Sequence, residues 1–596
     1  MARVAGGTPE LPGTRLRVTV DATPMVTRRR DVMTEQRDLV QVPGAGANEH
    51  RARTDFVVFG VTSAITVFFV LWGALSTRTL GKAASSALSW LVTNIGWGFV
   101  LASTAFVVFA LWLAFSRYGT IPLGADDEQP EFRTVSWIAM MFSAGMGIGL
   151  MFFGVSEPLA HFVNPPPGTV PPFSDEAVEV SMATTLFHWT LHPWSIYAVV
   201  GMAIAYSSFR RGRKQLISAV FAPLIGRRRC DGPIGKLIDI LALFATLFGS
   251  AASLGLGTLQ IQGGMQAAGW IGGVGSTVLV LIILVLTICF ILSAVSGIAR
   301  GIQWLSNINM VLAALLALFV FVVGPTVFIL DLLPTSVGVY LRDFATMIAR
   351  SGATGGTEMN TWLSSWTIFY WAWWISWTPF VGMFIARISR GRTIRQFVGG
   401  VILVPSAVSL VWFCILGGSA ISIQDRGIDV YRSGGEEAQT FAVLETLPLS
   451  LITTVLVMVL VAIFFVSGAD AASVVMGTLA QRGTIEPTRW MVIFWGAATG
   501  AVAAIMLVIG GEDALSGIQN LTFIASAPFA IVMVLLCVAL TKDLRDDPLM
   551  RRGQKGAEVL EQAVIAGTER HGKDFRLEVG PMDSGEEGSQ GGGRQS

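Results

Sequence analysis

The stretch SAGMGIGL, residues 143–150, places three glycines within five residues inside a long apolar run. A helix interior normally excludes glycine, which stabilises a helix by roughly 1 kcal/mol less than alanine because its backbone loses more freedom on folding. The stretch therefore predicts a membrane helix that breaks near its middle. The alternative interpretation is that the glycines only let neighbouring helices pack closely.

Apolar runs recur on both sides of this stretch. Of the 596 residues, 53% are hydrophobic and 14% are charged, and the mean hydropathy is +0.62. A run of about 20 apolar residues crosses the hydrocarbon core as a helix, and only helices satisfy their own backbone there. We predict an all-α polytopic membrane protein with twelve transmembrane helices, beginning near residues 56, 90, 134, 182, 237, 276, 307, 362, 396, 449, 490 and 515.

Basic residues gather in alternate loops, which predicts the orientation. Clusters follow the fourth span (residues 210–214 and 227–229) and the eighth (residues 387–395), whereas residues 157–180 contain no Lys or Arg. By the positive-inside rule, both termini are cytoplasmic in a multi-pass protein of the inner or plasma membrane. The polar first 55 residues argue against a cleavable signal peptide. Four widely spaced cysteines indicate neither disulfides nor a zinc site.

A second interruption is expected at Pro379, in the stretch FYWAWWISWTPF of residues 369–380. With the first two spans set aside, each interrupted helix opens a group of five spans, and an odd number inverts the second group in the membrane. The predicted organisation is a cytoplasmic tail (1–55), helices 1–2 (56–133), repeat one (134–333), an external amphipathic segment (334–360), repeat two (361–541) and a cytoplasmic tail (542–596).

The same stretch carries an aromatic stripe. Trp366, Tyr370, Trp373 and Trp377 recur at helical spacing, and Trp374 extends the stripe at one end. A quaternary ammonium has no N–H to donate, so ring faces can recognise it where hydrogen bonds cannot. A second aromatic group in the fourth span strengthens this interpretation over plain packing; its members are Trp189, Trp194 and Tyr197.

Charge in the spans suggests the sign of the ligand. We expect no acid in the central parts of spans 3, 4 and 8, which favours a zwitterion whose carboxylate meets the amides freed by the glycine break. His188 and His192 have a metal-ligand spacing but no evident third ligand, so we expect hydrogen bonds instead. Asp470 is an intramembrane acid that we expect to pair with Arg387, either as a gate or as a structural ion pair.

Four segments carry a resemblance to a known family. The stretches FRTVSWIAMMFSAGMGIGLMF, TTLFHWTLHPWSIYA, SWTIFYWAWWISWTPFVGMFIARISRGR and FFVSGADAASVVMGT closely resemble betaine/choline/carnitine transporters, in particular sodium-coupled glycine betaine symporters, and the resemblance covers residues 55–545. It implies a LeuT-like fold of two inverted five-helix repeats after two extra helices, often as a homotrimer. It also implies a carrier with no enzymatic activity, no cofactor beyond the coupling Na⁺ and no nucleic-acid partner.

The resemblance also implies site residues. Betaine would be bound by Trp373, Trp374, Trp377, Ala144, Ile148, Gly149 and Ser253, with Met146 typical of betaine-selective members and with Trp189, Trp194 and Tyr197 along the route. One sodium would be held by Ser143, Met146, Phe464, Ser467 and Gly468, and a second by Thr246, Ser250 and Phe380. The family's sodium-coupled members carry a second hydroxyl where Gly468 stands, so weaker sodium binding is expected.

The expected function is sodium-driven import of glycine betaine by alternating access across the bilayer. The alternative is a sodium-independent or proton-coupled carrier of choline, carnitine or another trimethylammonium compound. A passive channel and a membrane enzyme built on His188 and His192 are weaker hypotheses. Residues 542–596 carry 9 basic and 11 acidic residues, unlike the strongly basic tail of osmosensing members, so osmotic activation through that tail is not expected.

Overall fold

The computed structural model describes residues 53–571, except residues 146, 273–274, 297–298, 433 and 512. Almost the whole N-terminal tail therefore lies outside the described residues, as does the end of the C-terminal tail. Residues 50–544 form one compact unit, and α21 (Pro548–His571) belongs to a second, so each is described by itself. The helix α21 occupies part of the predicted C-terminal tail.

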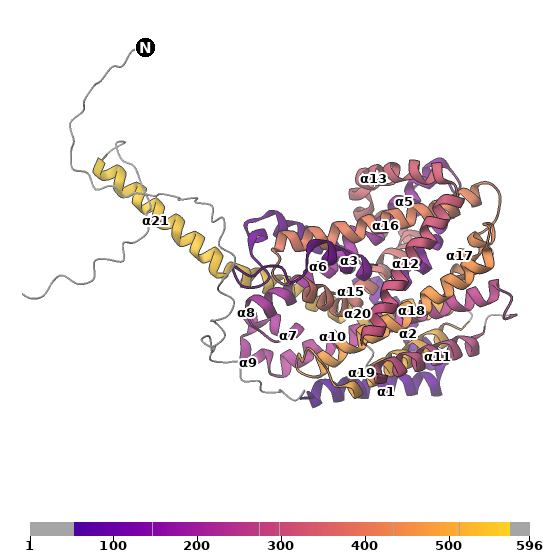
Figure 1. Cartoon of the computed structure of the whole chain (residues 1–596), viewed down its shortest axis with the longest axis horizontal. Coiled ribbons are helices and arrows are strands. Elements are labelled where there is room, and N and C mark those ends of the chain that lie inside the picture. The colour runs from indigo at the N-terminus through magenta and orange to yellow at the C-terminus, as the bar shows by residue number, and fades with distance from the viewer. Residues whose placement is uncertain are drawn as a thin grey trace, which may run out of the picture. The chain divides into compact units, whose positions relative to one another are not determined.

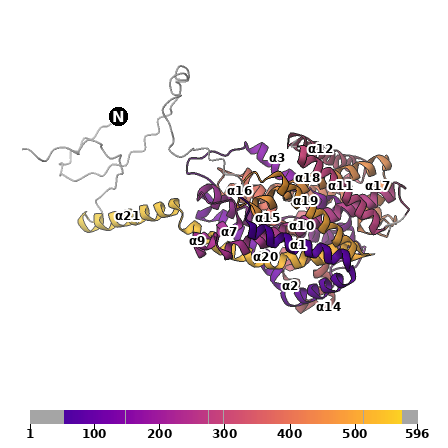
Figure 2. The ribbon, with the colours of Figure 1, turned by 90° about the horizontal axis from the view of Figure 1, so that it is seen from below.

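The larger unit is a bundle of helices (Figures 1 and 2). Its longer helices are α1 (Phe56–Leu75), α2 (Thr77–Phe115), α3 (Thr134–Gly145), α4 (Ile148–Val163), α5 (Asp175–Trp189), α6 (Leu191–Ala205), α10 (Pro233–Ala267), α11 (Ser276–Ser296), α12 (Ala299–Val323), α13 (Thr326–Ala349), α14 (Gly352–Leu363), α15 (Phe369–Ile388), α16 (Ile394–Asp425), α17 (Glu436–Glu445), α18 (Ser450–Ala480), α19 (Arg489–Gly510) and α20 (Ala514–Arg545). Short helices α7 (Ile217–Val220), α8 (Ala222–Ile225) and α9 (Arg227–Cys230) fill one basic loop.

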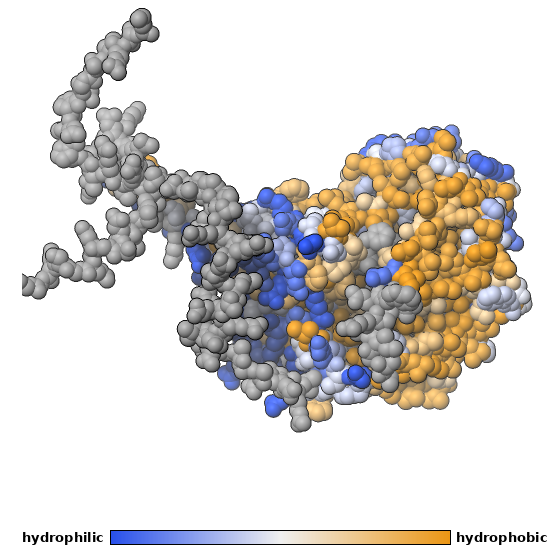
Figure 3. Space-filling view, in the orientation of Figure 1, coloured by the Kyte–Doolittle hydropathy of each residue, from blue (hydrophilic) through white to orange (hydrophobic). Residues whose placement is uncertain are grey.

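Eight of the described helices are long and apolar enough to cross a membrane, namely α1, α2, α10, α11, α16, α18, α19 and α20. The described spans number nine if α12 and α13, which are bent by 110° relative to each other, count as one. The other three predicted spans are divided into α3 and α4, α5 and α6, and α14 and α15. The fold is therefore an all-helical membrane bundle, and the count of twelve stays a prediction. Figure 3 shows apolar side chains over α11, α12 and α18 and hydrophilic ones over α7 to α9.

Helix contacts follow the predicted two groups of five. The helix α4, from the first predicted span of repeat one, packs against α16 of repeat two. The helix α15, from the first span of repeat two, packs against α6 of repeat one, and the third spans α10 and α18 pack on each other. Exchange of the two groups converts the contact of α4 with α16 into the contact of α15 with α6, and it leaves the contact of α10 with α18 unchanged. Two related repeats are expected to show this symmetry.

The first predicted break is confirmed, whereas the second lies elsewhere. Helix α3 ends at Gly145 and α4 begins at Ile148, with Gly147 extended between them. Helix α15 instead runs through Pro379 without interruption. A proline removes one backbone hydrogen bond from a membrane helix, and this loss is tolerated where neighbouring helices pack around it. The irregularity of this span is a π-helical turn upstream, at Ser364–Ile368.

Three predicted boundaries are also wrong. Helix α2 begins at Thr77 rather than near residue 90, so it extends well beyond one membrane thickness. Helix α13 covers Thr326–Ala349 and crosses the boundary that we expected between residues 333 and 334. The segment expected to be a loop from residue 157 begins inside α4, which continues to Val163 despite Pro158. Glu157 therefore lies within a helix of the bundle and not in a loop.

Candidate functional site

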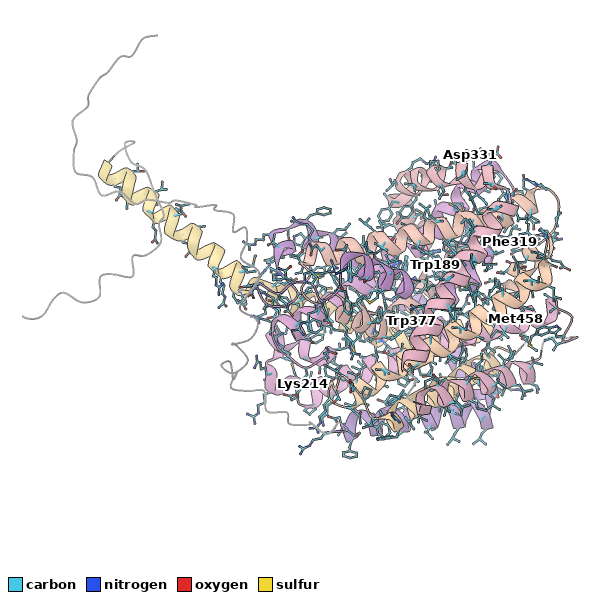
Figure 4. The ribbon with its side chains drawn as sticks, in the orientation of Figure 1. Trp189, Lys214, Phe319, Asp331, Trp377 and Met458 are labelled. Atoms are coloured by element: carbon cyan, nitrogen blue, oxygen red, sulfur yellow. The ribbon has the colours of Figure 1, made fainter. Side chains whose placement is uncertain are left out.

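Two adjoining cavities lie where the broken span meets the tryptophan-rich helix. The smaller, of about 40 Å³, is lined mainly by rings of α5, α6 and α15 and by the first turn of α4. The larger, of about 190 Å³, extends between α10, α15 and α18. Gly147, Ser253 and Trp377 line both cavities. Figure 4 shows Trp189 and Trp377 in the middle of the bundle, between Lys214 near one end and Met458 toward the other.

The smaller cavity is an aromatic box. Trp373 and Trp374 stack with ring centroids 4.6 Å apart, and Trp189 meets Trp374 edge-on at 4.9 Å. Tyr197 stands 6.5 Å from Trp377 at an interplanar angle of 65°. Six of the predicted aromatic residues line this one cavity: Trp189, Trp194, Tyr197, Trp373, Trp374 and Trp377. Trp366 and Tyr370 of the predicted stripe line neither cavity.

Hydrogen-bonding groups also lie beside the rings of this box. The Trp373 indole N–H donates to Ser253 Oγ at 3.3 Å, and the Tyr197 hydroxyl is buried without a partner among the described residues. The first turn of α4 carries amides that no preceding helical turn can satisfy. Its carbonyls are anchored from other helices, because Trp412 donates to Leu150 O and Gln260 to Met151 O. The broken helix therefore presents a fixed set of free donors beside the rings.

Behind the box lies a buried carboxylate that the sequence interpretation missed. Glu157 Oε2 accepts hydrogen bonds from the Trp189 indole and the Tyr370 hydroxyl, each at 2.5 Å. Its Oε1 lies 2.6 Å from His188 Nδ1. The expectation that span 3 holds no central acid is therefore wrong. Glu157 does not line either cavity, so it ties the rings in place instead of facing a ligand.

Comparison with known proteins identifies the family of the chain. The model of the betaine/carnitine/choline family transporters matches residues 57–549. The chain belongs to this transporter family. It is 44% identical to the betaine/ectoine transporter LcoP of Corynebacterium glutamicum, over 91% of this chain and 86% of that protein. It is also 44% identical to the glycine betaine transporter OpuD of Bacillus subtilis, over 85% and 97% of the two chains. These relatives are transporters, and this betaine/carnitine/choline transporter is not an enzyme.

A solved structure of a Na⁺-coupled sialic acid symporter, in a substrate-bound outward-open state, aligns with this family member at a TM-score of 0.39 and 14% identity. The alignment covers 74% of this chain and 86% of that one.

Most of the predicted sodium ligands of the transporter line the larger cavity, namely Ser250, Phe380, Phe464, Ser467 and Gly468. The Ser250 hydroxyl is buried and has no partner within the described part of the chain. Ser467 donates to Ile463 O at 2.8 Å, which leaves its oxygen lone pairs free. Thr246 instead donates to Ala242 O and lines neither cavity.

The other predicted ligand residues either line one of the two cavities or have side chains outside the described part of the chain. Met146 lies outside the described residues, and only the backbone of Ser143 and Ala144 is described, at the end of α3. Ile148 is buried and faces the larger cavity rather than the aromatic box. Trp194 lines the aromatic box together with Gly149, as predicted for a position near the ligand route.

The predicted pairing of Arg387 with Asp470 in this transporter is wrong. Arg387 donates to Gln215 Oε1 at 3.2 Å and to Thr478 Oγ1 at 3.5 Å. Thr478 lies eight residues beyond Asp470 on α18, roughly 12 Å along the helix axis. Arg387 therefore meets α18 more than two turns away from the acid, and a gating role for either residue stays a prediction.

The two histidines of the fourth span have separate partners, as expected. His192 stacks on Trp371 with centroids 4.5 Å apart and lies 3.4 Å from Thr104 Oγ1. His188 Nε2 lies 2.9 Å from Thr367 Oγ1, in the π-helical turn. His188 and His192 do not share a metal site.

An acid outside the spans gives a pH-dependent prediction. Burial raises the pKa of Glu436, in α17, to about 8 from its ordinary value of 4.5, and repulsion from Glu437 and Glu157 adds to the shift. Below pH 4.5 the carboxyl is neutral in both the folded and the unfolded chain. As the pH rises to about 8 only the unfolded chain releases this proton, so the folded state loses relative stability, and the full cost is present above pH 8.

Glu436→Gln should therefore raise the midpoint of thermal unfolding at pH 9 and leave it nearly unchanged at pH 4.5. Glutamine imitates the neutral acid, so the gain follows the ionisation of Glu436. The exposed Glu445, at the other end of α17, is the matched control, and Glu445→Gln should change neither midpoint. An equal gain at both pH values would show that the Glu436 substitution acts through packing.

Proposed function

We propose that the transporter imports glycine betaine, or a closely related zwitterionic compatible solute, by sodium-coupled symport with alternating access. The observation that carries the proposal is the joining of ring faces and free helix amides around one cavity at the break between α3 and α4. The trimethylammonium group would lie against the indole rings, each desolvated contact contributing about 0.5 to 2 kcal/mol. The carboxylate would face the amides that open α4.

The unpartnered Tyr197 hydroxyl supports a ligand with an acceptor as well as a cation. A buried donor without a partner costs roughly 1 to 3 kcal/mol, which a bound carboxylate would recover. Choline offers no carboxylate to either donor set. The names of the relatives LcoP and OpuD favour betaines and add ectoine as a second substrate class.

Sodium coupling is supported by the oxygen atoms of the larger cavity. Ser250 and Ser467 contribute hydroxyls, and the cavity adjoins the aromatic box through Trp377. A Na⁺ bound there would organise α10 and α18 around the substrate, and its transport down the gradient would drive import. The second candidate function is sodium-independent or proton-coupled transport of a trimethylammonium compound, which the missing hydroxyl at Gly468 favours.

We further propose that both termini face the cytoplasm and that the protein assembles as a homotrimer in the plasma or inner membrane. The basic loop that contains α7 to α9 would lie on the cytoplasmic side, and the acidic α17 outside.

Uptake of labelled betaine into proteoliposomes tests the function. We expect accumulation against the betaine gradient that requires an inward sodium gradient and is competed by ectoine more strongly than by choline. Uptake that is unchanged when potassium replaces sodium would exclude sodium coupling. Flux that only equilibrates the solute would exclude a symporter altogether.

Gly468→Ser should strengthen sodium coupling. A Cβ at this position meets no atom within 4 Å, so a side chain fits without displacing any neighbour. One added oxygen ligand is worth on the order of a tenfold lower sodium concentration for half-maximal uptake. Gly468→Ala supplies the same Cβ without the hydroxyl and should leave the sodium dependence unchanged. An equal effect of both variants would contradict a role for the hydroxyl as a ligand.

A further inference from the structure

A second cluster of ligand-type side chains lies outside both cavities. Glu157, His161 and His188 each offer one atom, and these three atoms lie within 4.8 Å of one another. All three side chains are fully buried. Glu157 and His161 face each other across one turn of α4, and His188 approaches from α5.

The state of His161 indicates that this cluster is incomplete. Neither ring nitrogen of His161 has a hydrogen-bond partner among the described residues. Its Nε2 lies 3.6 Å from Glu157 Oε1, too far for a hydrogen bond but suitable for two ligands of one ion. Burial of an imidazole without a hydrogen-bond partner costs free energy, and an ion bound between these atoms would offset that cost.

The neighbours of the cluster already orient its ligand atoms. The Trp189 indole and the Tyr370 hydroxyl occupy Glu157 Oε2, so Oε1 is the oxygen turned toward the two imidazoles. Thr367 holds His188 Nε2, so Nδ1 is the nitrogen turned toward Glu157. Outer partners of this kind fix the orientation and tautomer of metal ligands in metalloproteins.

We propose that Glu157, His161 and His188 form a binding site for a divalent zinc-class ion. Two imidazoles and one carboxylate are a ligand set that Zn²⁺ prefers, and a water or other group would complete its four-coordinate shell. The ion would replace the hydrogen bond between His188 and Glu157. The proton of His188 would then reside on Nε2 and be donated to Thr367 Oγ1.

Charge around the cluster acts in both directions. As Glu436 ionises near pH 8, its repulsion from Glu157 adds to the attraction of the cluster for a cation. Arg350 opposes it, since its guanidinium lies over the Trp362 ring that also contacts His161.

Occupancy would have a functional consequence because the cluster links two helices that build the proposed substrate site. Helix α4 begins at the glycine break, and α5 carries Trp189 of the aromatic box. An ion held by both helices would cross-link them and oppose any rearrangement that separates them. Bound metal would therefore inhibit transport.

The test uses the purified full-length transporter in detergent, stripped with a chelator, dialysed and titrated with Zn²⁺. We expect one ion per chain, with an X-ray absorption spectrum of two imidazole nitrogens and a carboxylate oxygen at about 2.0 to 2.2 Å. His161→Gln should weaken binding at least tenfold. His192→Gln should retain it, because His192 is equally buried on the next helix but stacks on Trp371.

Size-exclusion profile and thermal midpoint, measured without metal, separate loss of the site from loss of the fold. Glu157→Gln is the second variant, since it removes the anionic ligand while keeping an oxygen acceptor for Trp189 and Tyr370. Added Zn²⁺ should inhibit uptake by the unmodified protein and not by the His161 variant. Stoichiometry near zero in the folded protein, or binding that His161→Gln leaves unchanged, would overturn the proposal.

Discussion

Trp377→Leu should strongly reduce betaine uptake at low betaine concentrations while the protein remains folded. Trp377 lines both cavities and is only partly buried, whereas Trp373 and Trp374 are almost fully enclosed. Its ring face is therefore the one most available to an incoming cation. Loss of one desolvated cation–π contact costs up to about 2 kcal/mol, or roughly 30-fold in affinity.

Binding of betaine to the purified variant, followed by intrinsic fluorescence or calorimetry, measures this loss separately from transport. Trp97→Leu is the matched control, since Trp97 is 69% exposed on α2 and lies outside both cavities. Uptake of normal affinity by the Trp377 variant would show that the cation binds elsewhere.

Gly149→Ala should impair binding by a different route, through the shape of the box. A Cβ on Gly149 would lie 2.7 Å from Trp373 Cη2 and 2.9 Å from Trp189 Cη2. Both indoles are anchored by hydrogen bonds, to Ser253 and to Glu157, so neither ring can retreat freely. Overpacking of this kind typically costs about 1 to 3 kcal/mol, and we expect a loss of betaine affinity of about fivefold or more.

Gly399→Ala on α16 is the control for the general effect of a glycine substitution in a membrane helix, because a Cβ there meets nothing within 4 Å. A double substitution, Gly149→Ala with Trp373→Phe, relieves the nearer of the two contacts. Recovery of affinity in the double variant would confirm a steric cause, and a further loss would argue that Gly149 acts through backbone freedom.

Local chemistry made much of the site predictable. Glycines at 145, 147 and 149 weaken a helix wherever it lies, so the break in span 3 could be predicted from the sequence. The aromatic stripe depends only on helical periodicity, and Trp373, Trp374 and Trp377 do reach one cavity. Such features need no knowledge of what packs against them.

The errors came from features that depend on neighbouring helices. Glu157 followed by Pro158 looks like the start of a polar loop, yet donors from α5 and α15 satisfy the carboxylate inside the bundle. An acid and a histidine four residues apart within an apolar run were the available sign. Opposite charge is the only sequence feature that suggests a pair between Arg387 and Asp470, whereas the helix register brings Arg387 to Thr478.

The hydrogen bonds to Glu157 bear on any attempt to redesign the specificity of this carrier. One carboxylate fastens Trp189, which lines the aromatic box, and Tyr370, which stacks on Trp374, so a substitution of either residue also frees the carboxylate that holds the other. Trp377 and Trp194 have no bond to that carboxylate. A directed-evolution library that varies the untethered rings and spares the fastened ones should therefore yield new substrates with fewer inactive clones.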